Sequence, residues 1–189
     1  FESKSEETFS TFTLEVQGKK NLSESYSAFL VPDAFDSYKA NDELGYINVN
    51  SFSTIDKAPT NLILQLKRFD FDLATLQRKK INSRYEFTFE TDISSMLTNN
   101  ESPLIYELCG IVLHNGTSNS GHYFSYVKNE NSGEWLCCND SNVSKLSINS
   151  VISNSIGGTI ESKIYDKNKK EWIKKIRENS QSADRKSVV

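Results

Sequence analysis

The sequence predicts an α+β domain built mostly from an antiparallel sheet with a few short helices. Several short runs alternate apolar and polar residues, as Phe12, Leu14 and Val16 do, which is the period of a half-buried strand. Turn-forming residues separate these runs at hairpin-like spacings, which favours antiparallel pairing of neighbours. Helical spacing of apolar residues is confined to a few stretches, and the chain shows no internal repeat.

The first half contains one helix among strands. After the strand over 12–16, Asn21 is a good N-cap, and Glu24 three residues later predicts a capped helix that ends near Leu30. Further strands are predicted over 45–52, 62–69 and 85–89, with a charged connector over 72–80 and one helical turn over 91–96.

The second half begins with a strand over 104–113 that carries a bulge at Cys109 and Gly110. A polar loop over 115–121 follows, and strands are predicted over 122–127 and 135–139, with a turn cluster between them. A helix is predicted within 147–155 and a strand over 160–165. Residues 167–189 are predicted as a basic helix followed by a disordered tail.

Composition excludes several classes of function. The net charge is −3, which does not favour electrostatic binding to nucleic acid, and no apolar run approaches the length of a membrane span. Three cysteines, two of them adjacent, make a poor disulfide framework and indicate a reducing compartment. The chain begins at Phe1 and its only methionine is Met96, so we expect it to be part of a longer protein.

The stretch from Tyr106 to Ser144 holds both histidines and all three cysteines. His122 lies where a glycine-flanked loop enters a strand, and Asn139 and Asp140 end the next strand. If these strands pair, the imidazole comes within hydrogen-bond reach of a side-chain oxygen, which is the base-and-orienter half of a nucleophilic triad.

The same residues resemble the histidine box of the ubiquitin-specific proteases. The resemblance rests on Gly121-His122-Tyr123, Tyr126, Trp135 and the run from Asn139 to Ser144, although Cys138 and Asn139 replace the usual Phe and Asp. Further matching segments follow the family order from about Phe9 to Tyr165, including 15–25, 59–69, 80–87 and the pair Gly157-Gly158. The segment over 15–25 is most similar to the herpesvirus-associated branch.

The resemblance implies a papain-like cysteine protease fold, of which residues 1–166 supply the fingers and palm. The thumb, with the nucleophilic cysteine, would lie upstream, so this chain alone is expected to be inactive. His122 would be the general base, Asn139 its orienting partner and Asp140 an assistant. Ubiquitin's tail would run along a channel predicted to involve Phe69, Gly121, Tyr123 and Tyr126, beside gating loops over 72–79 and 115–121.

Other candidate residues carry plainer interpretations. His114, a lone histidine at a strand end, is interpreted as structural, and the three cysteines are interpreted as inert packing residues. The resemblance implies that a zinc site, where a family member has one, is built from two Cys-x-x-Cys pairs in the fingers. Residues 36–59 contain no cysteine, so we expect no zinc site. We also expect no cofactor. The expected partners are ubiquitin and ubiquitinated proteins, without nucleic acid or membrane, in the cytoplasm, the nucleus or both. The alternative function is a pseudoprotease module that binds ubiquitin without cleaving it.

Overall fold

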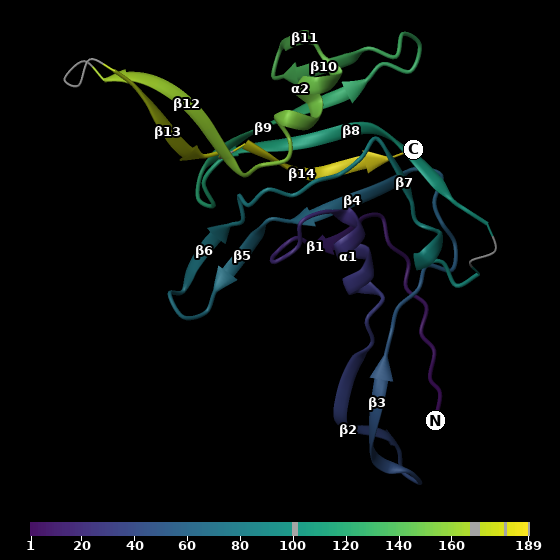
Figure 1. The fold of residues 1–189 in the computed structure, drawn as a ribbon. Helices are drawn as coiled ribbons and strands as arrows, with labels where there is room; N and C mark the ends of the chain where they lie inside the picture. The colour runs from purple at the N-terminus through teal and green to yellow at the C-terminus, as the bar shows by residue number, and fades with distance from the viewer. Residues whose placement is uncertain (100–101, 167–170, 180, 189) are drawn as a thin grey trace.

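The chain forms one large sheet from which three hairpins project (Figure 1). The computed structural model describes residues 1–99, 102–166, 171–179 and 181–188. The main sheet has eight strands in the path β1-β4-β14-β8-β9-β10-β11, with β7 paired to β8. They are β1 (Phe12–Glu15), β4 (Leu62–Lys67), β7 (Glu90–Asp92), β8 (Ile105–Gly116), β9 (Gly121–Lys128), β10 (Trp135–Asn139), β11 (Asn142–Leu146) and β14 (Gln181–Val188). Among these described strands only β1 and β4 pair in parallel, so the mostly antiparallel sheet is confirmed.

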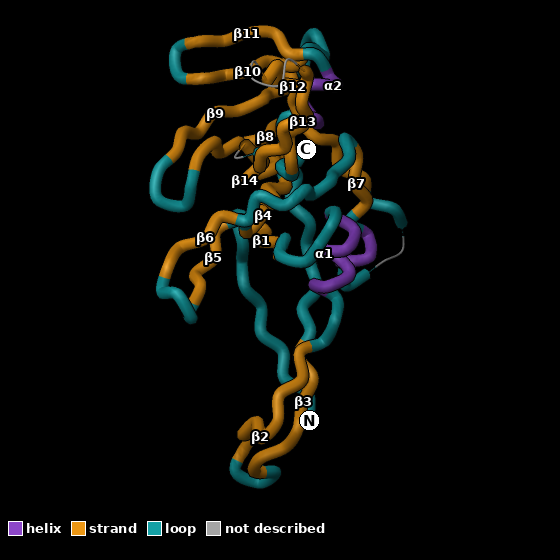
Figure 2. The backbone as a smooth tube through the Cα atoms, turned by 60° about the vertical axis from the view of Figure 1, so that its left-hand side comes forward, coloured by secondary structure: helices purple, strands orange, loops and turns teal. Residues whose placement is uncertain are grey.

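Three two-stranded hairpins complete the strand set. They are β2 (Asp33–Asn41) with β3 (Gly45–Ser51), β5 (Phe69–Asp72) with β6 (Gln77–Lys80), and β12 (Thr159–Asp166) with β13 (Glu171–Glu178). The β2–β3 hairpin extends away from the sheet at one end of the molecule, and β10 and β11 lie at the other end (Figures 1 and 2). The hairpin next to the predicted base is therefore far from the β2–β3 projection.

Three of the four predicted helical segments are confirmed, as α1 (Leu22–Phe29), the 3-10 turn η1 (Ser94–Met96) and α2 (Ile148–Ser153). Asn21 Oδ1 accepts the Glu24 backbone N–H at 2.9 Å, and the Glu24 carboxylate accepts the Lys20 N–H at 2.7 Å. This is a capping arrangement that satisfies N–H groups otherwise left open at a helix start. The Ser25 hydroxyl donates to Glu15 O at 2.7 Å and so ties α1 to β1.

The core lies where the alternating runs were predicted. In β4, Leu62, Leu64 and Leu66 are at most 1% exposed, and in β8 Leu108, Ile111 and Leu113 are equally buried. The predicted bulge at Cys109 and Gly110 is confirmed, because β14 pairs Gly110 with Ser187 and Leu108 with Val188 and skips Cys109. The extra residue shifts the alternation by one, which lets apolar residues on both sides of the bulge reach the same core.

The prediction of a basic helix within 167–189 is wrong, and residues 167–170 lie outside the described part. Residues Glu171–Glu178 form β13, which pairs antiparallel with β12 from Thr159↔Glu178 to Asp166↔Glu171. Lysine and glutamate favour a helix locally, but Trp172, Ile173 and Ile176 are also good strand formers. Pairing with an eight-residue neighbour decides between them, and that neighbour is a tertiary contact.

The prediction of a disordered tail is also wrong for residues Gln181–Val188, whereas Ser180 and Val189 lie outside the described residues. These residues form β14, which runs between β4 and β8 with ladder pairs on both sides. A polar sequence predicted disorder because it carries few apolar residues. The two flanking strands instead supply backbone partners for an extended chain.

The structure also forms strands that were not predicted. The stretch before β3 is the strand β2, and the predicted connector over 72–80 contains β6, which pairs with β5. The alternation over 85–89 reflects burial rather than a strand in the main sheet, since Tyr85 and Phe87 are buried while Glu86 makes only an isolated bridge with Asn21. Apolar and polar residues alternate wherever an extended backbone has one buried side and one exposed side. An extended loop segment meets this condition as well as a strand does.

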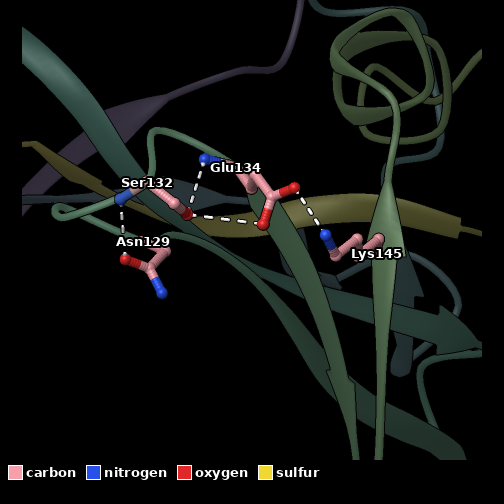
Figure 3. A network of polar contacts seen from close by, with 4 residues as sticks. All are labelled: Asn129, Ser132, Glu134 and Lys145. Carbon is pink, nitrogen blue, oxygen red and sulfur yellow. Dashed lines mark hydrogen bonds and ion pairs between the residues drawn. The ribbon is translucent and has the colours of Figure 1, made fainter.

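A polar network fixes the start of the β10–β11 hairpin (Figure 3). The Ser132 backbone N–H donates to Asn129 Oδ1 at 3.1 Å, and the Ser132 hydroxyl donates to Glu134 at 3.4 Å. Glu134 also forms an ion pair with Lys145 of β11 at 2.6 Å, which lowers the pKa of the Glu134 carboxyl. The turn before β10 is thereby linked to β11, and the other end of this hairpin carries the candidate site.

Candidate active site

The pairing of β9, β10 and β11 brings the predicted base and its orienting residue together. His122 is the second residue of β9, and Asn139 is the last residue of β10. His122 Nε2 lies 2.5 Å from Asn139 Oδ1. A carbonyl oxygen can only accept, so the imidazole donates through Nε2–H. The hydrogen bond selects the tautomer in which Nδ1 carries the lone pair of a base.

Asp140 is placed as an outer neighbour of the imidazole. It lies in the tight turn closed by the pair Asn139↔Asn142, and its backbone has a φ of 51°. Aspartate tolerates this left-handed conformation better than most residues. Its Oδ2 is 3.8 Å from His122 Nε2, and its side chain is 78% exposed. That distance is too long for a hydrogen bond.

One face of β9 forms an aromatic wall behind His122. The His122 ring lies parallel to Phe124 at 6.3 Å and 15°, and Phe124 packs edge-on against Tyr126 at 5.7 Å. Tyr126 is only 3% exposed, and its hydroxyl accepts from Gln181 Nε2 at 3.3 Å. Tyr126, which was predicted to contribute to the channel for ubiquitin's tail, is therefore buried, and its side chain packs behind Phe124 in the interior.

The other three residues predicted to bind substrate gather around His114. The His114 ring lies 5.2 Å from that of Phe69 and 4.7 Å from that of Tyr123. A Cβ on Gly121 would lie 2.1 Å from His114 Nε2, so only glycine fits there. Tyr123 is 52% exposed and offers an open aromatic surface beside this cluster.

His114 is buried, as its interpretation as structural implied, but it sits at the centre of this cluster. Burial lowers its pKa, and the nearby Lys80 ammonium lowers it further, so the ring is neutral at neutral pH. Its Nδ1 makes no hydrogen bond within the described residues. The sequence pattern placed neither His114, interpreted as structural, nor Lys80 in the site. The one signal for Lys80 was the family-like Lys80-Ile81-Asn82 segment, which does not indicate where the lysine side chain points.

Burial disfavours the thiolate form of two of the three cysteines. Burial raises the pKa of the Cys137 thiol and is the main cause that raises that of Cys109. An activated thiol needs the opposite shift. Cys138 pairs with Ser125 in the ladder, three residues along β9 from His122. Within the described residues no cluster of three or more potential ligand side chains could hold a metal ion. Equally, none of the described helices has the length and apolar character needed to cross a membrane.

The family model of ubiquitin carboxyl-terminal hydrolases matches residues 4–182 of the chain. The chain belongs to this family. It is 31% identical over 163 residues to ubiquitin carboxyl-terminal hydrolase 5 of Schizosaccharomyces pombe, with 84% of this chain and 15% of that protein covered. It is 32% identical over 149 residues to ubiquitin carboxyl-terminal hydrolase 48 of Rattus norvegicus, with 77% and 14% covered.

Solved structures of the family share the fold. The chain matches a SAGA DUB module bound to monoubiquitin with a TM-score of 0.71 and 26% identity, covering 96% of this chain and 35% of that one. For the module bound to ubiquitin aldehyde the TM-score is 0.70 and the identity 25%, with 96% and 36% covered. The predicted α+β, papain-like fold class is confirmed. This ubiquitin carboxyl-terminal hydrolase chain spans about one third of those structures and about 15% of the curated relatives.

Proposed function

We propose that this chain supplies the general base, its orienting partner and part of the ubiquitin-binding surface of a deubiquitinase. The observation that carries the proposal is the 2.5 Å hydrogen bond from His122 to Asn139, at the residue pair that the family pattern assigns to catalysis. Residues 1–166 act as the fingers and palm of the catalytic domain, and the cysteine nucleophile comes from the thumb, upstream of this chain.

The chemistry follows from the tautomer that Asn139 selects. His122 Nδ1 takes the proton of the upstream cysteine, and the thiolate attacks the carbonyl carbon of ubiquitin's last glycine. His122 then gives this proton to the departing amine, which leaves a thioester between the cysteine and ubiquitin. A water molecule loses a proton to His122 as it attacks the thioester, which releases ubiquitin and the thiol. Asn139 keeps the ring oriented throughout, and Asp140 stabilises the imidazolium by its charge.

The cluster around His114 is the part of the chain proposed to receive ubiquitin's tail. Gly121 leaves space for a close backbone approach, and Phe69 and Tyr123 provide aromatic surface on either side of His114. The position of this cluster supports the assignment, because His114 and Tyr123 are opposite each other in the pair of strands that carries His122. We propose ubiquitinated proteins as substrates, the herpesvirus-associated branch as the subfamily, and the cytoplasm, the nucleus or both as the location.

A pseudoprotease that holds ubiquitin without cleaving it is the second candidate. Cys138 and Asn139 occupy positions usually filled by Phe and Asp, which favours it. Asn139 nonetheless makes the contact required of an orienting residue, which favours the enzyme.

The test is to treat the full-length protein with ubiquitin that bears a C-terminal electrophile. Wild type should form a covalent adduct that His122→Ala slows strongly. Binding without an adduct would establish the pseudoprotease. Neither binding nor an adduct would refute both functions and leave only the shared fold.

A further inference from the structure

Lys80 is a buried lysine whose ammonium group donates hydrogen bonds to backbone carbonyls at the end of β8. It is the last residue of β6 and only 9% exposed. Its Nζ donates to His114 O at 2.9 Å and to Gly116 O at 3.3 Å. A buried ammonium is costly unless its donors are used, and charge-assisted hydrogen bonds to carbonyl oxygens are stronger than neutral ones.

The two carbonyls that Lys80 binds flank the residue opposite the base. Asn115 lies between them, and the β8–β9 ladder pairs Asn115 with His122. The next pair is Gly116↔Gly121, where both residues are constrained. A Cβ on Gly116 would lie 2.5 Å from Ser120 O, and one on Gly121 would meet His114. The backbone that carries His122 is thus packed against the strand end that Lys80 holds.

Lys80 is itself attached to the core. The next residue, Ile81, donates its N–H to Arg68 O at 2.6 Å and accepts from Arg68 Nη1 at 2.9 Å. Arg68 is 1% exposed. Hydrogen bonds therefore join the fully buried Arg68 to Ile81, and Lys80, the preceding residue in the chain, is hydrogen-bonded to the strand end opposite His122.

We infer that Lys80 is a positioning residue for the general base, an inference that rests on the proposed function. It acts through the β8 backbone and not by contact with substrate. His122 is held from two sides, by Asn139 at its ring and by Lys80 through the backbone opposite. Small displacements of a catalytic group are costly, because the reacting atoms must meet within a narrow range of geometry.

An exposed lysine in another part of the chain offers a control. Lys57 is exposed and lies in the connection between β3 and β4, outside the predicted channel and its gating loops. Lys57→Met and Lys80→Met in the full-length protein each remove one positive charge, and methionine keeps most of the side-chain length. Of the two, only Lys80→Met removes hydrogen bonds to the end of β8.

Two measurements are made on each variant. The first is steady-state cleavage of a ubiquitin C-terminal amide with a fluorescent leaving group. Lys80→Met should lower kcat about 10-fold with KM within about twofold, and Lys57→Met should match wild type. The second is amide hydrogen exchange, which needs no activity. Lys80→Met should speed exchange in peptides covering 112–124 and leave those covering β4 and β10 unchanged.

The outcomes separate this inference from the proposed function. Unchanged kcat together with unchanged exchange over 112–124 in Lys80→Met would overturn it. Faster exchange spread over β4, β10 and 112–124 alike would also overturn it, because Lys80 would then be a residue of general stability. If wild type itself is inactive, the proposed function fails, and the exchange pattern alone still decides whether Lys80 holds the strand end opposite His122.

Discussion

Removing the orienting oxygen of Asn139 is the most informative single change in the site. Asn139→Ala deletes the acceptor at 2.5 Å from His122 Nε2 and leaves the β10 backbone in place. The ring then loses the contact that selects its tautomer, so a fraction of the protein presents Nδ1–H to the nucleophile and cannot act as a base.

The expected size of this effect follows from other functional histidines whose second ring nitrogen is held by a hydrogen-bond partner. Loss of such a partner costs roughly 10–100-fold in activity. This range corresponds to about 1.4–2.8 kcal/mol of transition-state stabilisation. Asp140 limits the loss, because its carboxylate at 3.8 Å can move closer to an imidazole that has lost Asn139. We therefore expect a value near the lower end, about 10–30-fold in kcat.

The assay is a double-mutant cycle in the full-length protein, with kcat for the ubiquitin C-terminal amide as the readout. Asp140→Asn alone should cost less than about threefold, because its charge is largely exposed to solvent. In the Asn139→Ala background the same change should cost clearly more. An Asn139→Ala protein within twofold of wild type, or an Asp140→Asn loss larger than the Asn139→Ala loss, would refute the assigned roles.

Three further predictions concern backbone fit and stability. Gly121→Ala should abolish activity and lower the melting temperature, because its Cβ would lie 2.1 Å from His114 Nε2. Gly133, with φ of 70°, has open space around it, so Gly133→Ala should lower stability by only about 1 kcal/mol, and equal effects of the two substitutions would contradict the packing argument. Burial raises the pKa of Tyr85 to about 12, so the folded state keeps the phenol proton at a pH where the unfolded state has lost it. The free energy of unfolding should therefore fall as pH rises from about 10 to 12, and urea titrations should show a shallower fall in Tyr85→Phe. Asn21→Ala should cost about 1 kcal/mol in the same titrations through loss of the α1 cap, and no change would mean that the cap is redundant.

The contact between His122 and Asn139 could be predicted from the sequence, whereas several of the surrounding strands could not. Residue types and turn spacing indicated that His122 and Asn139 end up on neighbouring strands, and the structure places them in contact. Such a prediction works because hairpin partners are close in sequence, so local turn signals determine which strands pair.

Elements whose structure depends on contacts distant in sequence were predicted poorly. The residues of β13 were predicted as a helix and those of β14 as a disordered tail, because the strands that they pair with lie elsewhere in the chain. The hydrogen bond from Lys80 Nζ to His114 O joins residues 34 apart in sequence. No local sequence pattern indicates that a lysine is buried. Tyr126 was placed on the right strand, but its burial depends on the packing of that face.

The proposed function requires His122 to act as the base that converts an upstream cysteine to a thiolate. The most direct measurement is the pH dependence of alkylation of that cysteine by iodoacetamide in the full-length protein, with the modified peptide identified by mass spectrometry. In wild type the reaction should persist well below the ordinary thiol pKa of about 8.5, and in His122→Ala it should require pH near about 8.5. Identical pH profiles for the two proteins would contradict the account.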